Sequence, residues 1–369
     1  VWAALVCGPA RSQEVHALWL HPPDLGHSRD QVRQFVERAR GAHVELLVAL
    51  VKSTDGTIYW SSKKFPQAIP AAYRDFDMLG TLVEEAHRSG LRVHAWLCDF
   101  IEGQKSPAVR EHPEWVQLSD EGKTTASEML GPGRPYPYVW MCPARRPGYT
   151  DQWLLPMIEE IVRTYPVDGI HHDYVRYGGD VSPDGYCFCD FCVHDIFRHH
   201  LLAYQEADTQ RLSPERRLPR LEADLGRDYL AMPSLWEKWT RREKANFLLH
   251  GRYSKDTQPD LSYFFYTYRS DAITRFVREA FELGRRLRPK LEFSAAVFKN
   301  PMTSARFIAQ RWTEFTPWVQ EMMPMSYRSH FLGSFAEYLQ QFGEYTRRQK
   351  EWVGGRSRFY QGIATTYLF

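Results

Sequence analysis

The fold is decided by the stretch VDGIHHDYVRY at residues 167–177. It begins with apolar residues typical of a buried strand and ends in polar ones. Because side chains alternate along a strand, His171 and Asp173 share one face, and His172 and Tyr174 the other. If the first pair points into a barrel, Asp173 lies at its carboxyl rim, where it can meet a substrate. Arg176 then tunes its charge; the alternative is a structural Asp–Arg pair that closes the strand.

Similar apolar runs alternate with amphipathic segments along the chain, as expected of parallel strands wrapped by helices. Helices are predicted at Asp77 to Ser89, followed by Gly90, and at Asp151 to Thr164. No glycine-rich phosphate loop follows a strand, which argues against a Rossmann-like sheet. The prediction is therefore an α/β fold, a (β/α)₈ TIM barrel. Its strands are predicted at His16 to Leu20, Val44 to Val51, Arg92 to Phe100, Gly169 to Tyr174, Leu291 to Phe298, Glu321 to Tyr327 and Phe359 to Thr366.

Two connections are too long for simple turns. They run from Ile101 to Pro147 after the third strand and from Gly178 to about Asp260 after the fourth. Both follow the carboxyl ends of strands, where barrels of this kind build their active sites. We expect one barrel over residues 14–369, with residues 178–260 as an insertion after the fourth strand. We also expect a truncation near the last strand, because the chain stops at Phe369 within a strand-like run.

The charge pattern argues against a nucleic-acid partner, and the aromatic content favours a carbohydrate partner. The 47 basic and 45 acidic side chains leave a net charge of +2, and no run of Lys and Arg indicates a nucleic-acid site. The 12 Trp, 20 Tyr and 21 Phe residues suit stacking against sugars, although an aromatic-rich core is the alternative. Residues 1–13 resemble the remnant of a signal peptide, so we expect a secreted or periplasmic protein. No later stretch is long and apolar enough for an integral membrane segment.

Three cysteines lie close together just after the Asp173 strand. Cys187, Cys189 and Cys192 could bind a structural zinc ion, with Cys142, His194 or Asp190 as the fourth ligand. A disulfide between Cys142 and one of the three, or free buried thiols, are the alternatives. We expect no cofactor to be required for catalysis.

Five short motifs occur in order along the chain. They are His16-Ala17-Leu18-Trp19, Thr57 to Ser61, Ala86 to Trp96, Val167 to Tyr174 and Pro324 to Tyr327. They resemble the patterns R-G-V-W, A-L-Y-x-S, A-H-x-x-G-L-x-x-H-A-W, V-D-G-I-H-x-D-Y and P-x-x-Y of the family 10 glycosylhydrolase-like proteins. The resemblance covers nearly the whole chain from Glu14 onward. It implies a TIM-barrel glycoside hydrolase that acts on a carbohydrate substrate.

The chain also departs from the family pattern. His16 stands at the usual basic residue of the first strand, Lys52 replaces an arginine, and Cys142 replaces an asparagine. These differences leave the substrate open. A looser similarity to family-18 chitinases rests on Asp168, Gly169, Asp173 and residues 325–327. Val175 stands where those enzymes carry their general-acid glutamate, which argues against a chitinase mechanism.

Glycoside hydrolysis ordinarily needs two carboxyl groups. Asp173 is predicted to be one of them, and Asp99, then Glu128, are the preferred candidates for the second. Glu102, Asp180 and Asp184 are further candidates, and each of these residues also fits a solvated loop carboxylate. Trp96 and Tyr327 are predicted to stack under a sugar ring, with buried rings as the alternative. The full set of predicted substrate-binding residues is Trp19, Lys52, His94, Trp96, His171, Tyr174, Arg176 and Tyr327.

The leading hypothesis is a glycosidase that cleaves a polysaccharide or cell-envelope glycan, retaining or inverting. A non-catalytic glycan-binding barrel is the alternative, because Val175 leaves the acid in doubt. Metal-dependent deacetylation by His171, His172 and Asp173 is disfavoured, since adjacent residues of a strand face opposite ways. A second carboxyl within roughly 5 to 10 Å of Asp173 would favour the glycosidase.

Overall fold

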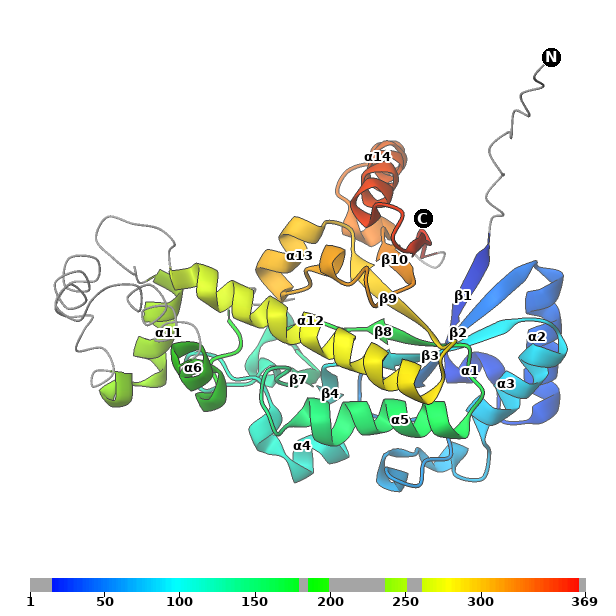
Figure 1. Ribbon diagram of the computed structural model, residues 1–369, viewed down its shortest axis with the longest axis horizontal. Coiled ribbons are helices and arrows are strands. Elements are labelled where there is room, and N and C mark those ends of the chain that lie inside the picture. The colour runs from blue at the N-terminus through cyan, green and yellow to red at the C-terminus, as the bar shows by residue number, and fades with distance from the viewer. Residues whose placement is uncertain (1–14, 179–184, 199–235, 251–260, 365–369) are drawn as a thin grey trace, which may run out of the picture.

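The computed structural model describes residues 15–178, 185–198, 236–250 and 261–364. A seven-stranded parallel sheet forms its centre, in the order β1-β2-β3-β8-β9-β10-β11. The sheet curls into a half-barrel with helices on its outer side (Figure 1). Six of the predicted strands are present over most of their length, and the parallel α/β prediction is confirmed. Of the strand predicted at Phe359 to Thr366, only Phe359 lies in a strand within the described residues. The strands are β1 His16–Leu20, β2 Val44–Lys52, β3 Arg92–Cys98, β8 Gly169–Asp173, β9 Glu292–Phe298, β10 Glu321–Met325 and β11 Arg358–Phe359.

The central strand β2 is apolar over most of both faces because both faces are covered. β2 is buried from Leu46 to Lys52, with helices outside and the barrel interior inside. Gly169 opens β8 beside His94 of β3, its register partner. A Cβ atom at Gly169 would lie 2.5 Å from His94 Nε2, so only glycine lets these two strands pair around the imidazole.

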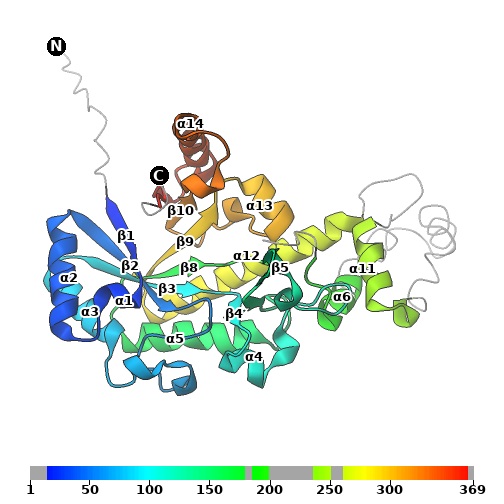
Figure 2. The ribbon, with the colours of Figure 1, turned by 180° about the vertical axis from the view of Figure 1, so that it is seen from behind.

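Helices connect successive strands and cover the outer face of the sheet (Figures 1 and 2). The predicted helix at Asp77 to Ser89 is confirmed as α3, with the Asp77 side chain accepting a hydrogen bond from Gly80 N. The second predicted helix begins with a π-helical turn at Thr150–Leu154. The 27-residue helix α12 is about 40 Å long and packs against α5. The connecting helices are α2 Arg29–Gly41, α3 Met78–Arg88, α5 Leu155–Thr164, α12 Leu261–Leu287, α13 Pro301–Ile308 and α14 Phe335–Val353.

The two long connections follow the carboxyl ends of β3 and β8, at the left of the sheet in Figure 1. The first carries two small antiparallel pairs, β4 with β7 and β5 with β6. The second carries α6 and α11 in its described parts. The elements are α4 Pro107–Glu111, β4 Ile101–Gly103, β5 Met129–Gly131, β6 Arg134–Pro135, β7 Tyr138–Trp140, α6 Asp190–Ile196 and α11 Arg241–His250; the short α1 Pro22–Leu25 follows β1.

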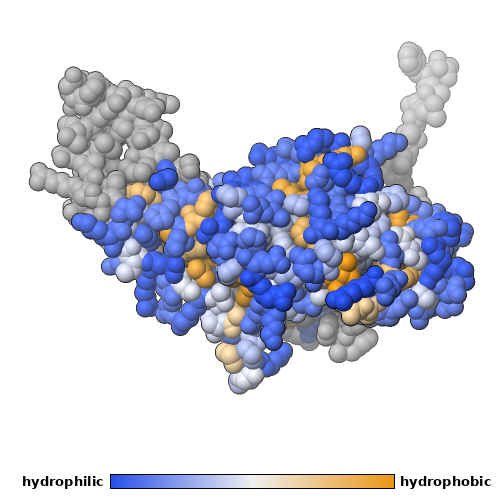
Figure 3. All heavy atoms as spheres, turned by 90° about the horizontal axis from the view of Figure 1, so that it is seen from below, coloured by the Kyte–Doolittle hydropathy of each residue, from blue (hydrophilic) through white to orange (hydrophobic). Residues whose placement is uncertain are grey.

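The surface seen from below in Figure 3 is mostly hydrophilic, with small separate apolar patches. Within the described ranges, no helix combines the length and apolarity needed to cross a bilayer. The predicted signal-peptide remnant at residues 1–13 lies outside the described residues.

Candidate functional site

A groove of about 1340 Å³ lies between the two edges of the curled sheet, β1 and β11. Asp173 reaches its wall from the carboxyl end of β8, and Trp96 reaches it from β3. Trp19 of β1 and Tyr327 after β10 contribute further aromatic rings to the lining. The structure thus brings together four predicted site residues from four strands. Further lining residues are His21, Ala296, Lys350, Arg358, Tyr360 and Gln361.

The Asp173 carboxyl group is poised to exchange a proton near neutral pH. Burial raises its pKa from 3.8 to about 6. A hydrogen bond that Tyr174 N donates to Oδ1, 2.7 Å away, opposes this rise, and so does the charge of Arg176. Such a pKa suits a general acid or base better than that of an ordinary solvated aspartate.

Ring contacts link Trp19, His171, Trp96 and His21 into a cluster beside Asp173. Trp96 is 8% exposed, and its ring meets those of His21 and His171 edge-on, with centroids 5.2 and 6.2 Å away. Tyr327 is partly exposed, and burial and the neighbouring Asp173 raise the pKa of its hydroxyl. Flat rings beside a carboxyl group are a suitable surface for the apolar face of a sugar.

A chain of hydrogen bonds runs from the groove into the barrel interior. Trp19 Nε1 donates to His171 Nε2 at 3.1 Å, so the proton of neutral His171 lies on Nδ1. His171 Nδ1 therefore donates to Ser294 Oγ at 2.8 Å, and Ser294 donates to His94 Nδ1 at 2.9 Å. Burial holds the pKa of His171 well below its usual range, which keeps it neutral. His171 and His94 are fully buried and therefore support the groove from beneath.

This series of hydrogen bonds ends at a charged layer on the opposite side of the barrel interior. His94 lies within 4.8 Å of the carboxylates of Glu292 and Glu321, a grouping that could hold a metal ion. Arg92 and Arg358 each form ion pairs of 2.6 to 3.0 Å with both glutamates. The two guanidinium groups balance the two carboxylates, so this layer is better explained as a structural network than as a cation site.

The backbone of Asp99, just after β3, lies beside that of Asp173 at the end of β8. The Asp99 side chain, however, lies on the other side of the sheet. Its carboxylate is fully buried and pairs with His172 Nδ1 at 2.9 Å. His172 in turn packs against Phe276 of α12, so this pair faces the helices. Burial raises the pKa of Asp99, and its charge raises the pKa of Asp173. In this geometry Asp99 acts on the groove only through its charge.

Lys52 is also fully buried and does not line the groove. Its Nζ donates to the main-chain oxygens of Cys98 and Ile101 at 2.6 and 3.0 Å. It forms an ion pair of 3.1 Å with Glu102, whose carboxylate also accepts from Tyr149 OH at 2.6 Å. Lys52 and Glu102 thus tie the ends of β2 and β3 together, and neither reaches the Asp173 carboxyl.

Tyr174 and Arg176 form a second layer of contacts beyond Asp173. Tyr174 has a left-handed backbone conformation with φ of 50°, which turns the chain out of β8. The Arg176 guanidinium lies over the rings of Trp140, Phe298 and Tyr174, with centroid distances of 4.4, 5.1 and 5.2 Å. These stacked contacts hold a buried positive charge next to the Asp173 carboxyl.

The remaining acidic candidates are not brought to the groove in the described part of the chain. Glu128 accepts a hydrogen bond of 2.5 Å from Tyr186 OH, in the long connection after β8. Asp180 and Asp184 lie outside the described residues. Asp173 is therefore the one acidic side chain that lines the groove within residues 15–178, 185–198, 236–250 and 261–364.

Four buried cysteines form a cluster, with one from the first long connection and three from the second. The sulfur atoms of Cys142, Cys187, Cys189 and Cys192 all lie within 4.8 Å of one another. No disulfide joins any of the described cysteines. The cluster contains all three cysteines predicted as metal ligands and the cysteine proposed as a fourth ligand. His194 and Asp190 are not members of the cluster.

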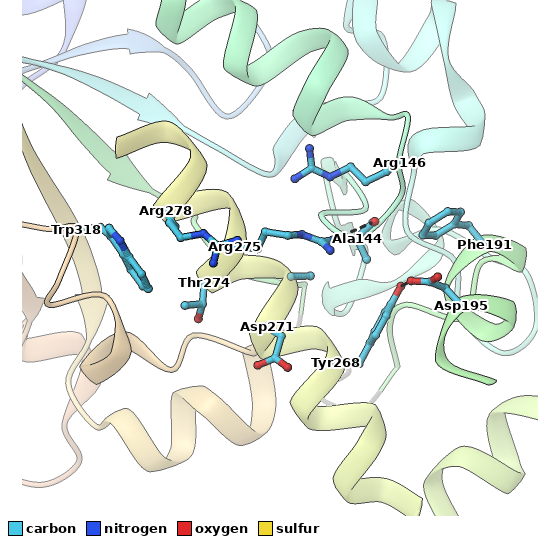
Figure 4. A pocket seen from close by; sticks show the side chains of 11 residues that line it. Ala144, Arg146, Phe191, Asp195, Tyr268, Asp271, Thr274, Arg275, Arg278 and Trp318 are labelled. Atoms are coloured by element: carbon cyan, nitrogen blue, oxygen red, sulfur yellow. Dashed lines mark hydrogen bonds between the residues drawn. The ribbon is translucent and has the colours of Figure 1, made fainter. Parts of the chain in front are cut away.

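A second cavity of about 590 Å³ is lined by residues of α6, of α12 and of the loop after Cys142 (Figure 4). α12 contributes Arg275 and Arg278 to it, and the loop after Cys142 contributes Arg146. Arg146 forms ion pairs with Asp151 and Glu279, and Asp195 accepts a hydrogen bond from Tyr268. The charged groups here hold α6, α12 and the Cys142 loop together, away from Asp173.

The sequence model of the family described as Glycosyl hydrolase-like 10 matches residues 14–368. The chain belongs to the glycosyl hydrolase-like 10 family.

One curated relative and two solved structures are similar to this chain. Glycosyl hydrolase DigH of Escherichia coli K12 is 24% identical over 145 residues, covering 33% of this chain and 29% of that protein. A β-galactosidase from Rahnella sp. R3 has a TM-score of 0.56 and 13% identity, covering 95% of this chain and 44% of that chain. The catalytic domain of a β-amylase from Paenibacillus polymyxa has a TM-score of 0.58 and 8% identity, covering 95% and 85%. At these identities the two structures show the fold, that of the TIM-barrel glycosidases.

Several residues of this glycosyl hydrolase-like 10 site were absent from the sequence prediction. Ser294 is a polar residue in the otherwise apolar β9, and strand alternation could have marked it as facing the interior. His330 stacks on Phe298 at 5.9 Å and donates from Nδ1 to Met325 O at 2.8 Å. Its position depends on the loop after β10, and no local sequence pattern reveals such a contact.

Proposed function

We propose that this glycosyl hydrolase-like 10 chain hydrolyses O-glycosidic bonds of a polysaccharide or cell-envelope glycan, with Asp173 as the proton donor. The observation that carries the proposal is the position of Asp173, a carboxyl group with a pKa of about 6 on the wall of an aromatic groove. A group with this pKa holds a proton over a useful part of the mildly acidic range and releases it readily.

The surrounding residues support distinct steps of this reaction. Trp96, Trp19 and Tyr327 would stack against sugar rings and orient the scissile bond beside Asp173. Asp173 would transfer its proton to the leaving oxygen as the glycosidic bond breaks. Arg176 would stabilise the carboxylate that remains, because its charge already favours the ionised form. Water, activated by a second group, would then complete the hydrolysis.

A second function, glycan binding without hydrolysis, is favoured by one specific observation. Hydrolases of this kind ordinarily place two carboxyl groups at the scissile bond. Within the described residues, Asp173 is the one carboxyl that lines the groove, and the neighbouring Asp99 is fully buried. Asp180 and Asp184, which follow β8 in sequence, remain candidates for the partner on sequence grounds.

The test compares glycan turnover and glycan binding in matched variants. Wild type, Asp173→Asn, Asp180→Asn and Asp184→Asn would be incubated with a panel of envelope and plant polysaccharides, and released reducing ends would be measured. Asp30→Asn is the control, because the Asp30 side chain is 72% exposed on α2. Circular dichroism would confirm that each variant is folded.

Loss of turnover in Asp173→Asn, with unchanged turnover in Asp30→Asn, is the expected result. A removed proton donor lowers the rate by about 10² to 10⁴-fold. Loss in Asp180→Asn or Asp184→Asn would identify the partner carboxyl. Binding of a glycan without turnover in wild type would contradict the hydrolase and support the binding barrel.

We also propose, from the sequence of residues 1–13, that the protein is exported. Fractionation of cells that express the full-length gene would detect the protein outside the cytoplasm, and its recovery in the cytoplasm alone would contradict export.

A further inference from the structure

The cysteine cluster joins two segments that are far apart in the sequence. Cys142 follows β7 in the first long connection, and Cys187, Cys189 and Cys192 lie in the second. Cys142 Sγ lies 3.3 Å from Cys192 Sγ and 4.0 Å from Cys189 Sγ. All four side chains are at most 1% exposed. Packing alone does not require four thiols at one point.

The spacing of the sulfur atoms fits a tetrahedral ion better than a disulfide. A zinc–sulfur bond of about 2.3 Å places the corners of a tetrahedron about 3.8 Å apart, in the middle of the spacings given above. A disulfide needs its sulfur atoms about 2.05 Å apart and would leave two buried thiols without a role. Cys189 N also donates to Cys187 Sγ at 3.5 Å, an N–H···S contact of the kind that stabilises a sulfur carrying negative charge.

We propose that Cys142, Cys187, Cys189 and Cys192 bind one structural zinc ion as four thiolates. Four protein ligands complete the tetrahedral coordination and leave no open position, as in structural rather than catalytic zinc sites. A zinc ion with four thiolate ligands carries a net charge of −2. Binding the metal accounts for the burial of four thiols at one point.

The zinc ion would connect the two long connections on the face that carries Asp173. Cys142 lies two residues after Trp140, whose ring supports the Arg176 guanidinium at 4.4 Å. Cys192 lies in α6, beside Phe191, which faces the second cavity with the loop at Ala144 (Figure 4). Zinc binding would thus fix Trp140 and, through Arg176, the surroundings of Asp173, without contacting a substrate.

Metal content and a cobalt spectrum test the proposal. The full chain would be purified without chelators, and its metals measured by inductively coupled plasma mass spectrometry. About one zinc per chain is expected in wild type, and only traces are expected in Cys142→Ser and Cys189→Ser. Cys98→Ser is the matched control, because Cys98 is a buried free thiol outside the cluster, and it should keep the zinc. Wild type reloaded with Co²⁺ should show the visible absorption bands of a tetrahedral cobalt thiolate.

Several outcomes would overturn the proposal. Zinc content in Cys189→Ser equal to wild type would place the metal elsewhere, and iron in place of zinc would refute the assigned ion. Metal-free wild type in which two of the six cysteines fail to react with Ellman's reagent after denaturation would establish a disulfide instead. If the serine variants do not fold, the cobalt spectrum of wild type decides, and the absence of thiolate bands refutes the site. None of these readouts depends on glycan hydrolysis.

Discussion

At the scale of single residues, two neighbouring aspartates have opposite surroundings. Asp173 faces the groove, whereas Asp99 faces the helices and pairs with His172. Asp99 N donates to Asp173 O at 2.8 Å, so the two backbones are adjacent even though the side chains point to opposite faces. This arrangement gives Asp173 a negative neighbour that helps to hold its pKa up, without a second carboxyl in the groove.

The raised pKa of Asp173 predicts a gain in stability for Asp173→Asn. The folded pKa of about 6 exceeds the ordinary value of 3.8, so proton binding favours the folded state. This stabilisation is complete below about pH 4 and is lost as the pH rises through 6. Asparagine lacks the ionisation cost, so the variant should be more stable than wild type above pH 6, by up to about 2 kcal/mol after allowance for partial exposure.

Urea unfolding of wild type and Asp173→Asn between pH 3.5 and 8 checks this prediction. The difference in unfolding free energy should grow between about pH 4 and 6 and then stay constant. Asp30→Asn should show no comparable change, because that carboxyl is exposed. A constant difference at every pH would mean that burial does not perturb Asp173.

The alternation of side chains between the two faces of a strand determined which site residues could be predicted from the sequence. The motif at residues 167–177 placed Asp173 at the carboxyl end of a strand, as the structure has it. The alternation of side chains also puts His94 and Trp96 on one face of β3 and Asp99, just after its end, on the other. The buried positions of Lys52 and Glu102 depend on contacts between distant segments, which no local pattern encodes.

At the scale of elements, a glutamate of α5 anchors the loop after β2. Glu160 accepts hydrogen bonds from Trp60 Nε1 at 3.1 Å and from Ser62 Oγ at 2.6 Å. The main-chain N–H groups of Lys63 and Lys64 donate to its other oxygen at 2.8 and 3.1 Å. These contacts outweigh burial and lower the pKa of Glu160, so its ionised form ties the loop to the helix.

Glu160→Gln should therefore destabilise the fold by about 1 to 2 kcal/mol at pH 7, because the amide cannot accept all four hydrogen bonds. The folded pKa is depressed, so the stabilisation exists above pH 4.5 and is lost as the pH falls through the folded pKa. The difference between the variant and wild type should therefore shrink as the pH falls below 4.5. Chemical denaturation at pH 7 and over a series of lower pH values measures the difference.

Glu159→Gln is the neighbouring control for this prediction. Glu159 pairs with Lys64 and Arg163 at the surface, and such pairs contribute less than about 1 kcal/mol. Equal losses in the two variants would show that the loop is not anchored by Glu160.

The elements themselves were the most predictable part of the fold. Long apolar runs such as β2 have a composition that fits few structures other than a buried strand, and the first six predicted strands are all present. The least accurate prediction concerned the last strand. β11 covers Arg358–Phe359, whereas the predicted strand ran from Phe359 to Thr366, partly outside the described residues. Whether an eighth strand closes the barrel stays a prediction.

At the scale of the whole molecule, the groove follows the line where the sheet is open. Its lining comes from β1 on one side and from α14 and β11 on the other, with Asp173 and Trp96 on its wall. In the described residues β1 and β11 do not pair with each other, so no hydrogen bonds between these strands close the groove. Its volume of about 1340 Å³ exceeds the 300 to 1000 Å³ typical of small-ligand pockets.

This shape predicts that, if the proposed hydrolysis is correct, the chain cleaves within a glycan rather than at its end. A groove of this size accommodates sugars on both sides of Asp173, and stacking on Trp19, Trp96 and Tyr327 adds binding energy for each additional ring. Turnover of end-labelled oligosaccharides should therefore rise steeply with chain length, by roughly tenfold for each further stacked sugar. Trp96→Ala should flatten this dependence, because it removes one stacking surface, and Trp153→Phe, remote in the aromatic core, should preserve it. Release of single sugars at a rate independent of length would instead mean that one subsite beside Asp173 carries all of the recognition.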